Sequence, residues 1–150
     1  MEHDSYMIGR YIGKLHNMMR RSLFRDSSGL DCTAAELRIL TLILRSSGPV
    51  YQKDIEEEFF LRAPTATGTL QKMEDKGFIT REPSETDARM KRIIPTEKSL
   101  AAKEAIIARV TAFENLISDV ISDRDIDIFC RTAEKMLGNL IRGNRKSEDK

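Results

Sequence analysis

Three cationic residues, Arg89, Lys91 and Arg92, stand close together in the middle of the chain. They follow a polar segment, Pro83 to Arg89, whose residue types favour an exposed loop. Cations at the end of an exposed loop are suited to phosphate contacts, and Arg in particular suits a narrow DNA minor groove. Eight basic and six acidic residues lie between Arg62 and Lys98. The cluster therefore favours a nucleic-acid contact, although the local excess of positive charge is small.

Residues that could support other chemistry are few and scattered. Cys32 and Cys130 lie 98 positions apart, and neither His3 nor His16 has a metal-ligand neighbour three or four positions away. Gly-rich phosphate loops, GxSxG elbows and HExxH pairs are missing from the sequence. We therefore expect no catalytic site, no metal and no cofactor. We expect both cysteines to be free, reduced thiols, with Cys32 buried or incidental. The alternative is that Cys32 senses oxidants, because it precedes a predicted helix N-terminus, where a thiolate is stabilised.

The composition is that of a helix-rich globular protein. Of the 150 residues, 40% are hydrophobic and 33% charged, with no Trp and four Pro. Apolar runs fall well short of the ~20 residues that a membrane span requires, and the N-terminus lacks a signal-peptide pattern. We expect a cytoplasmic protein that does not contact membranes. The net charge of +1 does not itself indicate nucleic acid, so the distribution of charge must be considered.

Hydrophobic spacing and capping residues predict four helices in the first half of the chain. The second helix begins at a capping box formed by Thr33 and Glu36. The fourth has Pro64 in its first turn and Gly77 as its stop signal. The expected ranges are about 6–25, 34–45, 51–59 and 63–76, with a loop at 26–29 after the first helix.

The periodicity then changes to that of short strands. Residues 78–82 and 90–94 indicate two strands around the polar loop, and we call this hairpin the wing. A long fifth helix is expected from Thr96 to about residue 122, which is roughly 40 Å at the helical rise. A sixth is capped by the Ser122–Asp125 segment and runs to about 142, before a frayed polar tail. The fold class is mainly α with a small β wing, in the order α-α-α-α-β-β-α-α.

The fourth helix divides into two faces when its residues are placed at 100° intervals. One narrow sector holds residues that should be buried, namely Ala66, Leu70, Met73 and Gly77. The opposite face is small, neutral or basic apart from Asp75, so it can approach base edges closely. There Gln71 can bond adenine through both ends of its amide. An ordinary solvated face is the alternative, but such a face would be expected to carry more Glu and Lys.

These elements together predict a winged helix-turn-helix that contacts double-stranded DNA. An inert protein-interaction module is the alternative from another class, because winged helices also serve that role. The cationic wing argues against such a module. The expected DNA-contacting residues are Arg62, Pro64, Thr65, Thr67, Gly68, Gln71, Lys72, Arg89, Lys91 and Arg92.

The run from Leu70 to Arg81, followed by Asp87-x-Arg89, resembles the recognition-helix-to-wing signature of the MarR family of transcriptional regulators. The specific motif spans 65–99, and the likeness in element order spans 6–141. It implies one MarR-like domain over 1–150, with the winged helix-turn-helix at about 33–95. Gly68 departs from the family pattern, in which Arg is common at this position, so the operator sequence stays open.

The resemblance also implies an obligate homodimer joined through helices at about 6–25 and 96–142. A two-fold dimer should prefer an inverted-repeat operator. The family likeness further implies a repressor that a small aromatic or anionic effector releases from DNA. It casts Asp87 as a support for Arg89, and it makes His16, Met19 and Arg20 the candidate effector-binding residues on the first helix.

Overall fold

The computed structural model describes residues 7–24 and 30–148. The loop predicted at 26–29 lies outside the described residues. The chain divides into two compact units, 1–113 and 114–150, which are described one after the other. The organisation as one MarR-like domain stays a prediction.

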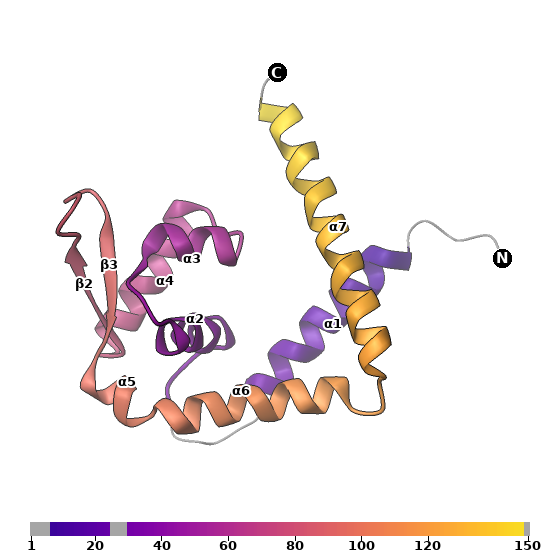
Figure 1. The fold of residues 1–150 in the computed structure, drawn as a ribbon, viewed down its shortest axis with the longest axis horizontal. Helices are drawn as coiled ribbons and strands as arrows, with labels where there is room; N and C mark the ends of the chain where they lie inside the picture. Colours follow the sequence, from indigo (N-terminus) through magenta and orange to yellow (C-terminus); the bar gives the residue numbers. More distant parts are fainter. Residues whose placement is uncertain (1–6, 25–29, 149–150) are drawn as a thin grey trace. The chain divides into compact units, whose positions relative to one another are not determined.

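The first unit contains the four helices predicted before the wing, followed after the wing by two helices where one was predicted. These helices are α1 (Met7–Phe24), α2 (Ala34–Arg45), α3 (Gln52–Glu58), α4 (Ala63–Asp75), α5 (Glu97–Ala101) and most of α6 (Lys103–Ser118) (Figure 1). The predicted capping box opens α2: the Glu36 amide donates to Thr33 Oγ1 at 3.2 Å, and the Thr33 amide donates to Glu36 Oε2 at 2.8 Å. Just beyond α4, Gly77 has a φ of 74°, a left-handed conformation that favours glycine.

The first unit also contains a three-stranded antiparallel sheet in the order β1-β3-β2. The strands are β1 (Val50–Tyr51), β2 (Ile79–Pro83) and β3 (Lys91–Pro95). The wing strands β2 and β3 each lie one residue later than predicted. The third helix, predicted from about Tyr51, begins one residue later, and the strand β1 before it was not predicted: Tyr51 pairs with Arg92 of β3. A strand of two residues is too short to produce the alternation from which strands are recognised.

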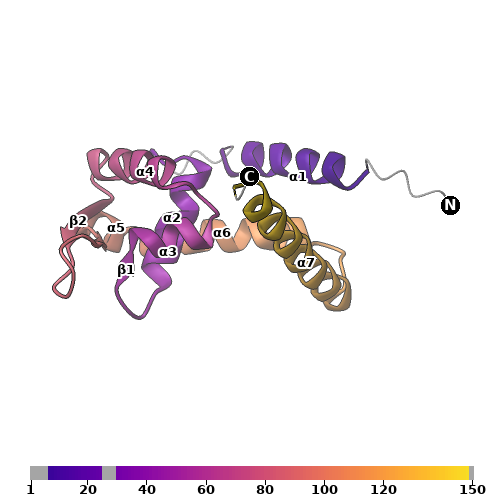
Figure 2. The same ribbon diagram turned by 90° about the horizontal axis from the view of Figure 1, so that it is seen from above.

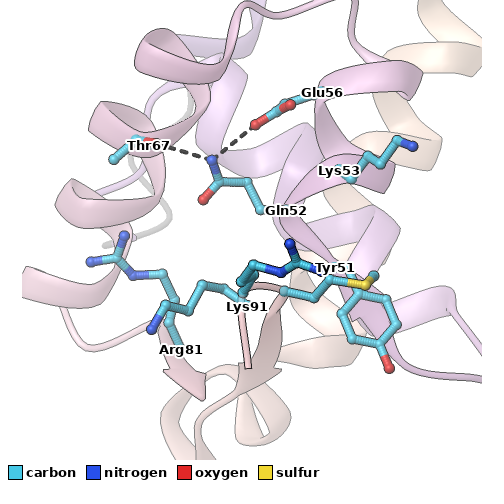
Figure 3. Close-up of a pocket in the computed structure, with 9 residues that line it drawn as sticks. Tyr51, Gln52, Lys53, Glu56, Thr67, Arg81 and Lys91 are labelled. Carbon is cyan, nitrogen blue, oxygen red and sulfur yellow. Dashed lines mark hydrogen bonds between the residues drawn. The ribbon is translucent and has the colours of Figure 1, made fainter. Parts of the chain in front are cut away.

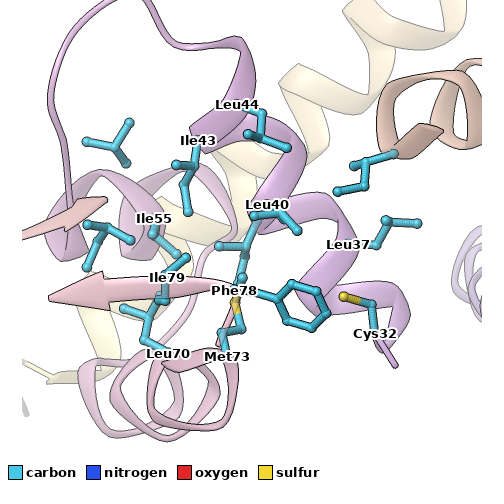
Figure 4. Close-up of a cluster of buried hydrophobic side chains, with 14 of the residues drawn as sticks. Cys32, Leu37, Leu40, Ile43, Leu44, Ile55, Leu70, Met73, Phe78 and Ile79 are labelled. Carbon is cyan, nitrogen blue, oxygen red and sulfur yellow. The ribbon is translucent and has the colours of Figure 1, made fainter. Parts of the chain in front are cut away.

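The core of the first unit packs one face of α4 against α2, α3 and β2 (Figure 4). Ala66, Leu70 and Met73 are fully buried, as predicted, whereas Gly77, the fourth residue of the predicted sector, is only half-buried. Phe78 and Ile79, at the start of the wing, are also almost completely buried. Burying a side chain of this size contributes about 1.5–3 kcal/mol. The core therefore fixes which face of α4 is presented to solvent.

The single helix expected over 96–122 was wrong, because this segment forms two helices. At Ala102 the backbone leaves the helical conformation, with φ −90° and ψ 0°, and separates α5 from α6. The direction of α5 is set by the wing: Ser99 Oγ donates to the Phe78 carbonyl at 2.6 Å, and Lys98 Nζ lies 4.3 Å from the Phe78 ring centroid. The break was not visible in the sequence, because the apolar periodicity becomes regular only from Ile106 onward.

The second unit contains the end of α6 and the helix α7 (Asp123–Glu148). Helix α6 ends at Ser118, and Val120 follows with a φ of 57°, which is unusual for a β-branched residue. The predicted cap is present, since the Asp125 amide donates to Ser122 Oγ at 3.1 Å. The prediction of a frayed tail from residue 143 was wrong, because α7 continues as far as Glu148 and no Pro interrupts it there. None of the described helices is long and apolar enough to cross a membrane.

Candidate nucleic-acid interface

The outward face of α4 is open along its length. All of the residues predicted to contact DNA on this helix are exposed, namely Pro64, Thr65, Thr67, Gly68, Gln71 and Lys72. A Cβ added at Gly68 would meet nothing within 4 Å, so packing does not require a glycine at this position. Arg62, the N-cap residue of α4, is exposed as well. The core on the other side of the helix leaves this face free to approach a groove.

The wing holds a guanidinium in solvent beside a carboxylate. Its loop is closed by backbone bonds from the Ser84 amide to the Met90 carbonyl at 2.8 Å and from the Met90 amide to the Asp87 carbonyl at 2.9 Å. The Arg89 side chain is 91% exposed. Asp87 Oδ1 accepts from the Arg89 amide at 3.0 Å and from Arg89 Nε at 3.2 Å. These bonds to Arg89 hold the pKa of the Asp87 carboxyl below its usual value.

Figure 2 shows the wing loop extending beyond α4. The hydrogen bonds between Arg89 and Asp87 place Asp87 next to Arg89, as the family resemblance implied. Its role as a support for DNA binding stays a prediction.

An open pocket of about 410 Å³ lies between the wing and the helices α3 and α4 (Figure 3). Among the predicted contacts, it brings together Thr67 of α4 with Arg89 and Lys91 of the wing. The full lining is Tyr51, Gln52, Lys53, Glu56, Thr67, Arg81, Arg89, Met90 and Lys91. Four of these nine residues are cationic and one is acidic. A phosphate group would meet an excess of positive charge here. Arg92 is exposed on β3 but is not part of the lining.

Six of the nine lining residues were not predicted from the sequence, and two of these, Gln52 and Arg81, bond to side chains of α4. Gln52 Nε2 donates to Thr67 Oγ1 at 3.0 Å and to Glu56 Oε1 at 2.9 Å, which links α3 to α4 (Figure 3). Arg81 of β2 donates to Glu74 of α4 from Nε at 2.9 Å and from Nη2 at 2.7 Å. The only sequence signal for Arg81 was its place in the family motif. Its partner depends on how the strand lies against the helix.

The cysteines and the candidate effector residues lie elsewhere. Cys32 is 9% exposed, and burial, together with the Glu36 carboxylate, raises the pKa of its thiol to about 11. Little thiolate then forms near neutral pH, which argues against the oxidant-sensor alternative. On α1, His16 and Arg20 are exposed and Met19 is half-buried. None of these three lines the pocket described above, so their effector role stays a prediction.

Helices α2 to α4 followed by the β2–β3 hairpin define the class of this domain, a winged helix-turn-helix. Residues 30–90 match the model of the MarR family (MarR_2). This segment of the chain is therefore similar to the MarR family, in agreement with the resemblance of the motif.

A curated relative is consistent with this similarity. The HTH-type transcriptional regulator YwoH of Bacillus subtilis (strain 168) is 31% identical over 86 residues. That match covers 57% of this chain and 62% of the relative, so the chain spans about three fifths of the length of the curated protein it matches.

Two solved structures share the fold. The transcription regulator MarR from Oenococcus oeni PSU-1 has a TM-score of 0.78 at 24% identity, covering 87% of this chain and 98% of its own. The S. aureus MepR–DNA complex has a TM-score of 0.77 at 20% identity, covering 88% of this chain and 97% of its own.

Proposed function

We propose that this chain is a sequence-specific, double-stranded DNA-binding transcriptional regulator rather than an enzyme. The observation that carries the proposal is the convergence of Thr67, Arg89 and Lys91 on one cationic pocket beside the open face of α4. In winged helix-turn-helix proteins the recognition helix enters the major groove while other elements contact the backbone. The likeness to MepR, which was solved bound to DNA, supports this use of the fold.

The proposed contacts divide into readers and anchors. Helix α4 lies in the major groove, where the exposed Gln71 reads adenine and the Thr67 hydroxyl bonds phosphate or a base edge. The pocket receives the backbone between helix and wing, so Lys91 acts as a phosphate anchor. Arg89 extends into the flanking minor groove, where a narrow groove favours guanidinium. The neutral surface of Gly68 lets the helix approach closely.

The protein acts as a homodimer in this proposal. Helix α1 exposes apolar side chains on successive turns, among them Ile8 (54%), Ile12 (53%) and Leu15 (45%). In the second unit, α7 exposes Phe129 (62%) and Leu140 (65%). Apolar stripes of this extent indicate interfaces. A two-fold dimer would recognise an inverted repeat with half-sites about one helical turn apart. In its more specific form, the proposal is that the dimer represses transcription until a small aromatic or anionic effector releases it from DNA.

Selection of bound duplexes from a random pool, followed by titration at several salt concentrations, tests the proposal. Gln71→Ala is expected to lose about 1–3 kcal/mol on the best operator and to relax preference at one position per half-site. Lys91→Ala is expected to weaken binding to all sequences, with a salt slope about one unit shallower per lost phosphate contact. Arg45→Ala, an exposed change at the end of α2 outside the predicted contacts and the dimer helices, is the control that should bind as wild type does.

Two results would contradict the proposal. If the protein bound no duplex at low salt, the protein-interaction module would be favoured instead. If Gln71→Ala left the selected consensus unchanged, Gln71 would not be a reader.

A further inference from the structure

The side-chain amide of Gln71 is held at both ends. On the wing side, Arg81 Nη2 donates to Gln71 Oε1. On the helix side, Gln71 Nε2 donates to Asp75 Oδ1 at 2.9 Å, one turn further along α4. A guanidinium can only donate and an ionised carboxylate can only accept. The two neighbours therefore dictate which end of the amide carries the oxygen.

Arg81 is itself firmly placed. Its amide donates to Glu74 Oε1 at 3.0 Å, while its Nε and Nη2 donate to Glu74 Oε2 at 2.9 and 2.7 Å. The Arg81 side chain is 17% exposed and that of Glu74 is 30% exposed. A planar guanidinium held by a carboxylate in this way keeps a fixed orientation. The strand β2 thus supplies a rigid donor to an otherwise free side chain on α4.

We propose that Arg81 is a positioning residue that determines base preference by fixing the orientation of the Gln71 amide. The inference rests on the proposed function, because it explains how the amide of Gln71, the proposed base-reading residue, is oriented. With both contacts made, the amide retains one lone pair on Oε1 and one N–H on Nε2. These are the groups that complement the N6–H donor and the N7 acceptor of adenine.

The reversed amide would be unfavourable in this setting. Rotation by half a turn would place the Gln71 N–H₂ against the Arg81 guanidinium and its oxygen against the Asp75 carboxylate. The same arrangement accounts for Asp75, the one acidic residue on a face that is otherwise neutral or basic. Its carboxylate orients a reader even though it would repel phosphate at long range.

Arg81 also lines the cationic pocket, so the test must separate its charge from its geometry. Arg81→Lys keeps the positive charge but replaces a planar fork with a single ammonium, which cannot hold Glu74 and Gln71 in the same way. Asp75→Asn, a change on the exposed face, retains an acceptor oxygen but adds a donor. The amide of Gln71 can then bond residue 75 in either orientation.

The experiment measures discrimination between bases at each operator position by competition titration of the full-length protein at fixed salt. The variants are Gln71→Ala, Arg81→Lys, Asp75→Asn and the double variant Gln71→Ala/Arg81→Lys. Arg81→Lys should lose discrimination of about tenfold at the position that Gln71→Ala relaxes, because a bidentate pair provides roughly 5- to 150-fold. It should keep its salt slope and its affinity for random DNA. In the Gln71→Ala background, Arg81→Lys should change the preference no further.

Asp75→Asn should relax the same position, and it carries the test if Arg81→Lys fails to fold, as judged by thermal melting. Electrostatics alone predicts instead that Asp75→Asn tightens binding to every sequence. The inference is overturned if Arg81→Lys retains the wild-type preference, or if it weakens all sequences equally in both backgrounds. A wild-type protein that binds DNA without any base preference would overturn the proposed function itself, which is a separate result.

Discussion

A partly buried ion pair joins the end of the recognition helix to the start of α2. Lys76 Nζ lies 2.9 Å from Glu36 Oε2, and the Glu36 side chain is only 2% exposed. The hydrogen bond to Glu36 raises the pKa of the Lys76 ammonium above its usual value. Lys76 directly precedes Gly77, where the chain turns into the wing. Removing the ammonium should therefore destabilise the unit that positions the interface.

The expected cost of Lys76→Ala follows from this environment. Removing one partner of a fully buried ion pair lowers the free energy of unfolding by about 3–5 kcal/mol. Lys76 is 25% exposed, so water can partly replace it, and the Thr33 amide still donates to Glu36 at 2.8 Å. We therefore expect about 2–3 kcal/mol. For a domain of this size, that corresponds to a fall in melting temperature of about 10 °C.

Thermal unfolding followed by circular dichroism at constant protein concentration measures this effect. The matched control is Lys53→Ala, which removes an exposed i,i+4 pair with Glu57 (74% and 69% exposed) and should cost about 0.5 kcal/mol or less. A double variant, Lys76→Met/Glu36→Leu, should recover part of the loss, since no unpaired charge remains buried. A melting temperature for Lys76→Ala as close to wild type as that of the control would refute the reasoning.

Asp87→Ala should weaken operator binding even though it removes a negative charge, because Arg89 loses its carboxylate partner; tighter binding at fixed salt would end this explanation. Arg89→Lys should recover only part of the affinity lost in Arg89→Ala. Folding raises the pKa of Cys32 from 9.0 to about 11. Ionisation of this thiol should therefore leave the free energy of unfolding unchanged below pH 9 and lower it by about 2–3 kcal/mol as the pH rises to about 11. Denaturant titrations of Cys32→Ala should lack this loss, and native Cys32 should react with iodoacetamide at pH 8 at least tenfold more slowly than in urea. Sedimentation at micromolar concentration should give a dimer mass, and a monomer would contradict the α1 and α7 interfaces.

The sequence predicted the features that depend on local preferences. The capping box at Thr33, the stop at Gly77 and most of the buried sector of α4 each follow from residues a few positions apart, and all three are present. Features set by contacts between distant segments were not predictable in this way. The strand β1 exists through pairing with β3. The break at Ala102 accompanies the anchoring of α5 on the carbonyl and the ring of a wing residue.

The candidate interface shows the same division. Phasing alone indicated that Gln71 is exposed, but not that its amide is held by Arg81 and Asp75. The small net charge between Arg62 and Lys98 also understated how well this surface suits DNA, because a count of charges does not show which of them are paired. Several of its carboxylates are bonded to cationic or amide side chains, as Asp87 is to Arg89 and Glu74 is to Arg81. These acids offset the net charge while reducing the freedom of the groups that would meet DNA. A pre-oriented side chain loses less entropy on binding, so a modest net charge is compatible with a specific DNA contact.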